Sequence, residues 1–342
     1  MDPSIKLAKL YSSFEAKEPV YQAPKAYSKE IKLKANVTTT KEKVSIPEIE
    51  FSKSVLNNSI FMNQDALELA NLDAVLNVTH STFGLLGSIL SKEVYDGQVP
   101  VFADLGGIPG GWVQYLQYRW QRCQGYGISL DNNKYDKSGI EFNGVNTFTL
   151  LEGLEDHSGD IITNFDSLYD RIHKYHPYGL NLVIANATTQ SKDYYKYLIA
   201  QMLFGLKILS NKGVLILRVA EVFSSNILEL IQLLTYAFEE FYLFKPFASG
   251  FDSSRYLVAR VKRKDQTTMN ILEKAFELIK KDKTIKTLIE KVNEEVETYV
   301  NEINLDVDKF EIEYDEKNYN LVRLYYYWDI PSYSERKIYK RF

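Results

Sequence analysis

The sequence predicts an α/β fold with a largely parallel sheet, and three observations support this. Apolar runs of strand length recur at VPVFADLGG, CQGYGISL, NLVIANA, GVLILRVA, FYLFKPFA and RYLVARV. Segments with helical spacing of apolar residues, such as YYKYLIAQMLFGLKIL and SSNILELIQLLTYAFEEF, lie between several of these runs. Glycines follow the first run directly. Strands that alternate with helices require crossover connections, so we expect parallel strands with helices on both faces.

Composition narrows the class of protein. A chain of 342 residues is long enough for one main α/β domain with extensions at both ends. Lys and Arg total 41 against 45 Asp and Glu, so the net charge of -4 gives no general attraction for RNA, and any RNA site must be a local patch. The single cysteine, Cys123, excludes an internal disulfide and a cysteine-rich metal site, and it is expected to be a small buried residue in a protein of a reducing compartment.

Hydropathy argues against a membrane protein. No apolar run approaches the roughly 20 residues that a membrane-spanning helix needs. The start of the chain, MDPSIKLAKLYSSFEAKEP, lacks the apolar stretch of a signal peptide. We therefore expect a soluble cytoplasmic protein, or a virion protein if its source is a virus, with no membrane partner.

The chain divides into three expected parts. Residues 1–50 are rich in Lys, Ser, Thr and Glu without a sustained period, which is typical of a flexible or wrapping arm, either a solvated tail or a docking segment. Residues 51–263 hold the α/β domain, with a helix expected in FMNQDALELANLDAVLNV. Residues 264–342 form a helical and aromatic extension. Its basic, aromatic end is expected to pack on its own domain, with stacking on bases as the alternative.

The stretch DLGGIPGGW, from Asp104 to Trp112, is the most informative in the sequence. Glycines after a buried strand let the backbone approach a ligand beyond the carboxyl end of a sheet. This string resembles the cofactor motif of the FtsJ-like family of S-adenosylmethionine (SAM)-dependent RNA 2′-O-ribose methyltransferases. Further blocks over residues 61–263 occur in the order found in eukaryotic and viral cap-1 methyltransferases of that family: FMNQDALELANLD, YGISLD, GDIIT, NLVIANA, LKILSNKGVLILRV and LFKPFASGFDSSRYLVARV. The resemblance implies a Rossmann-like, mostly parallel sheet of about seven strands.

The same resemblance implies SAM as cofactor and assigns residues to its pocket. Asp104, Gly106 and Gly110 would shape the methionine end, Asp131 would meet the ribose hydroxyls, and Asp160 would accept from the adenine amino group. The remainder of the strip would complete the pocket: Gly107, Pro109, Gly111 and Trp112. The alternative is that the glycines only turn the chain and the aspartates only cap helices.

The family's catalytic tetrad is Lys-Asp-Lys-Glu, and this chain departs from it at every position. Matching the blocks places Glu68, Asn186, Arg218 and Ser254 where the four residues would stand. A desolvated lysine can act on a ribose hydroxyl, whereas arginine keeps its proton and asparagine carries no charge. We therefore expect no intact catalytic residue, with Asp252 as a possible rescue that still supplies no lysine. Glu68 and Arg218 are expected to form an ion pair across the former cleft.

Three functions are consistent with this pattern. The leading hypothesis is an inactive homologue of cap-1 methyltransferases that serves as a non-catalytic subunit of an RNA-capping or transcription assembly, with a virus as one expected source. Its expected partners are capped RNA and a protein of that assembly. The second is an active SAM-dependent cap 2′-O-methyltransferase with an altered site. The third is a structural or virion protein on a methyltransferase fold.

Overall fold

The structure of the protein is a computed structural model. It describes residues 59–79, 99–120, 122–136, 147–187, 193–222, 224–246 and 254–304, with side chains described to residue 300. The predicted arm at 1–50, the aromatic end of the chain and Asp252 lie outside the described residues.

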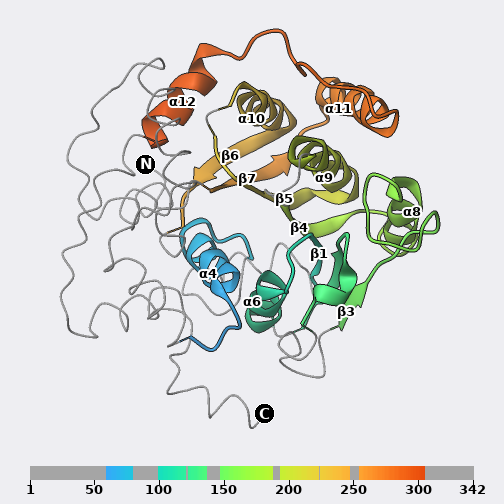
Figure 1. Ribbon diagram of the computed structural model, residues 1–342. Coiled ribbons are helices and arrows are strands. Elements are labelled where there is room, and N and C mark those ends of the chain that lie inside the picture. The colour runs from blue at the N-terminus through green and yellow to red at the C-terminus, as the bar shows by residue number, and fades with distance from the viewer. Residues whose placement is uncertain are drawn as a thin grey trace, which may run out of the picture.

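The described strands form one seven-stranded sheet in the order β3-β2-β1-β4-β5-β7-β6 (Figure 1). Strands β1 to β5 pair in parallel, whereas β7 runs antiparallel to both β5 and β6. This confirms the predicted Rossmann-like, mostly parallel sheet of about seven strands. The bounds are β1 Val101–Leu105, β2 Gln124–Ile128, β3 Thr147–Leu150, β4 Leu180–Asn186, β5 Leu209–Val219, β6 Phe238–Phe244 and β7 Arg255–Lys262.

Helices cover both faces of the sheet, which explains why its strands are apolar at successive positions. Phe102 faces the side of α4 and α6, while its neighbour Ala103 faces the opposite side. The same alternation divides β4 and β5 between two apolar clusters. Figure 1 shows α4 and α6 on one face and α8, α9 and α10 on the other. These helices are α4 Gln64–Leu76, α6 Gly111–Trp120, α8 Phe165–Tyr175, α9 Tyr194–Ile208 and α10 Ser225–Ala237.

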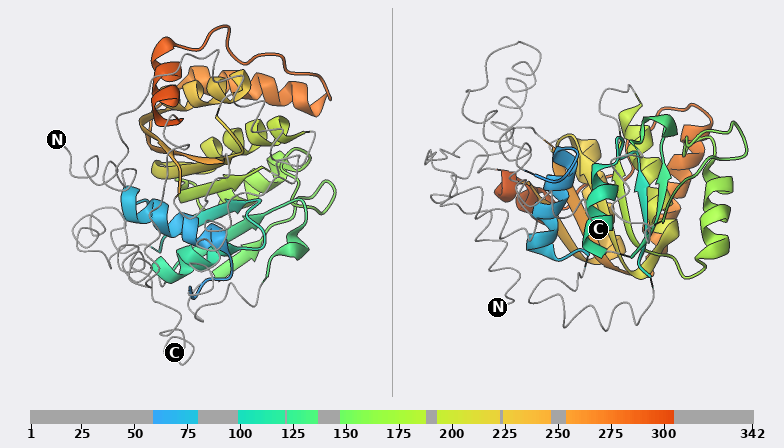
Figure 2. Two further views of the ribbon diagram at one scale, coloured as in Figure 1. Left: turned by 60° about the vertical axis from the view of Figure 1, so that its left-hand side comes forward. Right: turned by 90° about the horizontal axis from the view of Figure 1, so that it is seen from below.

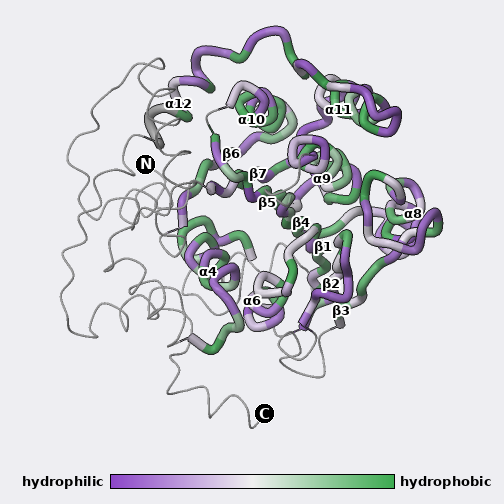
Figure 3. The backbone as a smooth tube through the Cα atoms, viewed as in Figure 1, coloured by the Kyte–Doolittle hydropathy of each residue, from purple (hydrophilic) through white to green (hydrophobic). Residues whose placement is uncertain are grey.

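Two further helices, α11 Gln266–Lys280 and α12 Glu294–Asn304, continue the second layer (Figure 2). On α11 the buried apolar residues recur at helical spacing and join the cluster beneath α9 and α10. Figure 3 shows hydrophobic and hydrophilic colours alternating along α11, as expected of a helix with one buried face. The segment between α11 and α12 is held by α10, where Glu229 accepts from the Leu288 N–H at 2.6 Å. The core therefore continues as far as residue 300.

A buried polar cluster fixes α4 against α6. The carboxylate of Asp73 accepts from the backbone N–H of Thr79 at 2.8 Å, from its hydroxyl at 2.7 Å and from the Tyr115 hydroxyl at 2.8 Å. Arg119 lies 3.3 Å from the same carboxylate. A buried carboxylate with several donors is well satisfied, so this cluster stabilises the contact between the helices. Because Glu68 also lies on α4, the cluster helps to fix its position.

Cys123 is a free, buried cysteine, as expected, and burial raises the pKa of its thiol to about 12. Within the described ranges, no helix combines the length and apolar character needed to cross a membrane. Acidic, histidine and cysteine side chains do not gather into a metal-binding group anywhere in those ranges.

Candidate cofactor and catalytic site

The glycine turn lies at the carboxyl end of β1, as predicted. The Gly106 N–H donates to the Ile128 carbonyl at 2.8 Å, so the turn adjoins the end of β2. Gly106 has φ +84° and Gly110 has φ +115°, a region of backbone conformation that favours glycine. A Cβ on Gly106 would lie 2.6 Å from the carbonyl oxygen of Asn186, at the end of β4. The turn therefore approaches the sheet edge too closely for any side chain.

Asp104 is a fully buried carboxyl on β1, one residue before the strand ends and the glycines begin. Its Oδ1 accepts from the Gly107 N–H at 3.0 Å, whereas its Oδ2 has no hydrogen-bond partner among the described residues. Burial raises the pKa of this carboxyl to about 8. A buried polar atom without a partner costs stability, and such atoms in native proteins concentrate at functional sites.

Asp131 and Asp160 each cap a local turn, as the structural alternative anticipated. Asp131 accepts from the Asn133 N–H at 3.2 Å and pairs with Lys134 at 3.3 Å. Asp160 accepts from the Ile162 N–H at 3.0 Å and the Thr163 hydroxyl at 2.8 Å. Both side chains remain partly exposed, so capping leaves acceptor positions open to solvent. Their roles toward ribose and adenine stay predictions.

The segments that carry these two aspartates lie side by side. A Cβ on Gly159 would fall 2.2 Å from the carbonyl oxygen of Ser129, just after β2. The geometry therefore brings Asp131 and Asp160 to the same edge as the glycine turn.

The remaining residues of the strip shape the turn and its packing. The Pro109 carbonyl accepts from the Asp136 N–H at 2.9 Å. A Cβ on Gly111 would lie 1.7 Å from Oδ1 of Asn63, the N-cap residue of α4. Trp112 is buried, and its ring lies edge-on to that of Tyr256, with 6.1 Å between the ring centroids. These contacts join the turn to α4 and to β7.

The four positions matched to the tetrad gather at the same edge of the sheet. Asn186 pairs in register with Arg218 on the neighbouring strand, and Arg218 pairs with Tyr256 on β7. Ser254 lies two residues before Tyr256, and Glu68 on α4 accepts from the Tyr256 hydroxyl at 2.6 Å. The structure therefore brings together residues that the sequence separates by up to 188 positions.

The expected ion pair between Glu68 and Arg218 is present, but it is the longer of two. Arg218 Nη2 lies 3.7 Å from Glu68 Oε2, whereas its Nη1 lies 3.0 Å from Asp65 Oδ1. The Glu68 side chain is 1% exposed, against 20% for Arg218. Burial raises the pKa of Asp65, and the nearby guanidinium opposes that shift. The arginine is therefore shared by two carboxylates on one face of α4.

Three polar residues at this edge were not identified from the sequence. Asp65 precedes Glu68 by three residues, so helical spacing alone could have indicated it. Lys245, after β6, places its Nζ 3.4 Å from the backbone oxygen of Ser254. Gln201, on α9, donates from Nε2 to the Leu105 carbonyl at 3.1 Å. The contacts of Lys245 and Gln201 depend on tertiary structure, and no local pattern signals them.

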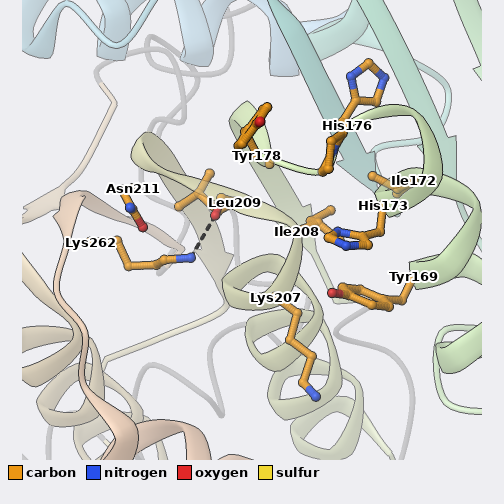
Figure 4. A pocket seen from close by; sticks show the side chains of 12 residues that line it. Tyr169, Ile172, His173, His176, Tyr178, Lys207, Ile208, Leu209, Asn211 and Lys262 are labelled. Atoms are coloured by element: carbon orange, nitrogen blue, oxygen red, sulfur yellow. Dashed lines mark hydrogen bonds between the residues drawn. The ribbon is translucent and has the colours of Figure 1, made fainter.

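A separate pocket of about 300 Å³ lies at the opposite edge of the sheet, between α8 and the starts of β4 and β5 (Figure 4). Lys262 enters it but donates to the carbonyls of Leu206 at 3.0 Å and Leu209 at 2.7 Å. Lys207 points away from the other lining residues and pairs with Glu273 at 2.8 Å (Figure 4). Both ammonium groups are thus already engaged, and the pocket does not form part of the predicted site.

Together, the sheet order, the glycine turn and the buried acid define a Rossmann-like α/β protein, in which the turn lies at the carboxyl ends of the parallel strands, where such folds bind ligands. Residues 69–262 match the family described as FtsJ-like methyltransferase. Because this match covers more than half of the chain, the protein belongs to the FtsJ-like methyltransferase family.

Individual relatives are more distant. The chain is 28% identical over 235 residues to a cap-specific mRNA (nucleoside-2'-O-)-methyltransferase 1 of Drosophila melanogaster. That match covers 64% of this chain and only 29% of the relative. Among solved structures, an rRNA methylase from Streptococcus thermophilus is 15% identical, with a TM-score of 0.33 over 48% of this chain and 88% of that one. Human methyltransferase-like protein 13 in complex with SAH is 10% identical, with a TM-score of 0.34 over 54% of this chain and 85% of that one.

Proposed function

We propose that this protein is a catalytically inactive FtsJ-like homologue that binds SAM and serves as a non-catalytic subunit of an RNA-capping or transcription assembly. The observation that carries the proposal is the state of Glu68. It stands where the family's first lysine is expected, and it is held by Tyr256 and Arg218 out of contact with solvent. A side chain engaged in this way does not act on a ribose hydroxyl.

The residues at the glycine turn fit the cofactor. The glycines let the turn run close against the end of β4 at Asn186, and Asp104 keeps a buried oxygen without a partner among the described residues. When bound, SAM supplies an electrophilic methyl group. The side chains matched to the tetrad provide no free base for the hydroxyl proton, since Glu68 is held by Tyr256 and Arg218, Arg218 keeps its own proton and Asn186 is neutral.

The assembly role rests on the combination of an intact cofactor edge and a replaced tetrad. A fold that has lost its chemistry keeps surfaces that bind ligands and partners. Similarity to a cap-specific mRNA methyltransferase makes capped RNA and a protein of a capping or transcription complex the proposed partners. Cytoplasmic location and a viral source belong to the same proposal.

Active methylation with an altered site is the second candidate, and Lys245 favours it. Its ammonium group reaches the backbone oxygen of Ser254, where the family's glutamate is expected. A lysine in this position could replace one function of the missing pair. Its contact is with Ser254 and not at the position of Glu68, so it does not restore the first lysine.

Titration calorimetry with SAM, followed by methyl transfer to capped RNA, tests the proposal. We expect saturable binding of SAM and no 2′-O-methylation above background, because the tetrad positions no longer hold a lysine that could act on the ribose hydroxyl. Methylation by the natural protein would establish the active candidate instead. Absence of measurable heat at about 1 mM SAM, a concentration that detects binding as weak as about −4 kcal/mol, would favour a structural role.

Gly106→Val should abolish SAM binding and reduce stability. Its Cβ would meet the Asn186 carbonyl at 2.6 Å, and a β-branched residue at φ +84° is strained. We expect a loss of roughly 2 kcal/mol in the free energy of unfolding and no detectable calorimetric signal. Gly205→Ala is the matched control. Gly205 lies on α9, and a Cβ there would meet a flexible Leu215 methyl group at 2.9 Å, so binding should persist.

A further inference from the structure

The edge of the sheet opposite the glycine turn concentrates positive charge. Residues 171–179 lead from α8 into β4, and residues 206–212 lead from α9 into β5, whose first residues pair with each other. Neither segment contains Asp or Glu, and each contains two Lys or Arg residues. The antiparallel strand β7 ends at the same edge with three basic residues, 262–264. These three segments, here called the basic edge, form a local positive surface on a chain of net charge -4.

Acidic side chains of the adjoining helix α11 are already engaged. Glu273 pairs with Lys207 at 2.8 Å. Asp265, which follows the basic edge directly, caps α11 by accepting from two backbone N–H groups at 3.1 Å. Lys174 and Lys212 remain exposed on the basic edge. The excess of positive charge is therefore available to a polyanion.

Tyr178 projects from the basic edge into solvent and is 92% exposed. The turn that carries it is nevertheless fixed. The His176 ring lies 2.8 Å from the hydroxyl of Tyr126 on β2, and the Gly179 N–H donates to the His176 carbonyl at 3.0 Å. A Cβ on Gly179 would lie 2.5 Å from the backbone nitrogen of Ser210, so the turn packs directly against the start of β5. A tyrosine held exposed on a fixed turn adds little to the core, and its ring is arranged in advance for stacking.

Tyr178 also lines the pocket of about 300 Å³ at this edge. Asn211 and Lys262 lie on one side of the pocket, and Tyr169 and His173 on the other (Figure 4). The rings of Tyr169 and His173 stack with 5.2 Å between their centroids. Lys262 donates to two carbonyls, whereas an ammonium group has three N–H donors, so one donor remains for a ligand. The pocket thus combines aromatic rings with hydrogen-bond donors, the features that hold a nucleotide.

We propose that the basic edge binds single-stranded RNA. Tyr178 provides a stacking surface for a base, Asn211 and Lys262 donate to the nucleotide in the pocket, and the exposed lysines contact neighbouring phosphates. Single strands present both phosphates and open base faces, whereas a duplex hides its base faces. An acidic peptide would satisfy the lysines, but its carboxylates leave the ring of Tyr178 without a partner. The inference goes beyond the proposed function, because this surface lies away from the glycine turn and requires neither SAM nor a cap.

Fluorescence anisotropy with a labelled, uncapped oligouridine of about 12 nucleotides tests the inference, since this length lies within the usual site size. Tyr178→Ala should bind at least about fivefold more weakly at equal salt, the loss expected for one stacked base. Tyr178→Phe keeps the ring and should bind as the natural protein does. Because the side chain is 92% exposed, both variants should unfold at the same temperature as the natural protein. Equal affinity of Tyr178→Ala and the natural protein would overturn the inference.

The salt dependence of binding provides a second arm. Lys212→Gln should reduce the slope of log Kd against log salt concentration by about 0.7, the value for one phosphate contact on a single strand. Lys286→Gln is the matched control, because Lys286 is also exposed but lies in the segment between α11 and α12. It should leave the slope unchanged. A duplex of the same length should bind more weakly than the single strand. Equal slopes for Lys212→Gln and the natural protein, or tighter binding of the duplex, would contradict the proposed contacts.

Competition with polyglutamate distinguishes RNA from an acidic protein partner. If polyglutamate displaces the RNA and its own binding also weakens in Tyr178→Ala, the surface is a protein-docking site and the inference is overturned. Failure of the natural protein to bind the RNA at about 50 mM salt, where phosphate contacts are strong, overturns it as well. Calorimetry with SAM separates the two proposals. RNA binding without SAM binding refutes the proposed function alone, whereas SAM binding without RNA binding at this edge refutes the inference alone.

Discussion

Asp104→Asn is expected to raise the free energy of unfolding by about 3 kcal/mol at neutral pH. Most single substitutions lower it. Burial raises the pKa of Asp104 in the folded state to about 8, against an ordinary value of 3.8. Between these values the folded protein holds a proton that the unfolded chain has released. Stability contributed by this group is therefore complete at acid pH and is lost progressively as pH rises toward about 8. Asparagine resembles the protonated acid and removes that loss.

Denaturant unfolding at about pH 5 and about pH 8 measures the effect, since the two values bracket most of the titration. The advantage of Asp104→Asn should grow with pH over this interval. Asp131→Asn is the control, because its side chain is 43% exposed and it should show no comparable gain. An Asp104→Asn protein with the same pH dependence as the natural one would show that the carboxyl is charged and paired in the folded state. The gain in stability would come with weaker ligand binding, the usual conflict at a functional site.

Simultaneous replacement of Glu68 by Lys, Asn186 by Asp, Arg218 by Lys and Ser254 by Glu should create 2′-O-methylation of capped RNA. These positions already lie together at one sheet edge, so the four side chains would meet without a change of backbone. Acid–base catalysis contributes about 10²–10⁴ in rate, and groups that act as a unit lose it together. Each single reversion should therefore stay at background in a radiolabelled methyl-transfer assay.

Replacement of Asp65 provides a further test of the fourfold variant. It holds Arg218 at 3.0 Å and would equally hold a lysine at that position. The fourfold variant should therefore gain further activity when Asp65 is also replaced by Ala, which frees the new lysine. Equal binding of SAM by all variants is the control for folding. Activity in a single reversion, or none in either multiple variant, would contradict descent from a tetrad enzyme.

The sequence predicted the sheet and the glycine turn because both depend on local patterns. Strands buried on both faces are apolar at successive positions, and glycines mark the turn at the end of β1. The matched blocks also predicted that Glu68 and Arg218 would lie within ion-pair distance. The preference of Arg218 for Asp65 could not be predicted, because it depends on the rotation and height of α4 against β5.

Gln201 illustrates the limit more clearly. In the sequence it is one polar residue in the apolar stretch LIAQMLFGL, and its partner at Leu105 lies 96 residues earlier. Periodicity identifies which side of a helix is buried, but it does not identify the backbone carbonyl that a side chain on that side will contact. Asp131 and Asp160 show the converse case, since capping was a predicted alternative and is what their contacts show.

The placement of α11 and α12 has a consequence for the order in which the chain can fold during synthesis. All the residues expected at the cofactor site and at the four positions matched to the tetrad precede residue 260, whereas the apolar layer behind α9 and α10 is completed by residues as late as Val300. A nascent chain that has just emerged beyond β7 thus has both faces of its sheet covered, but the apolar surface of α9 and α10 that packs against α11 and α12 is still exposed. Domains fold as units, and exposed apolar surface invites aggregation. The ligand edge should become stable only after the last helices have left the ribosome.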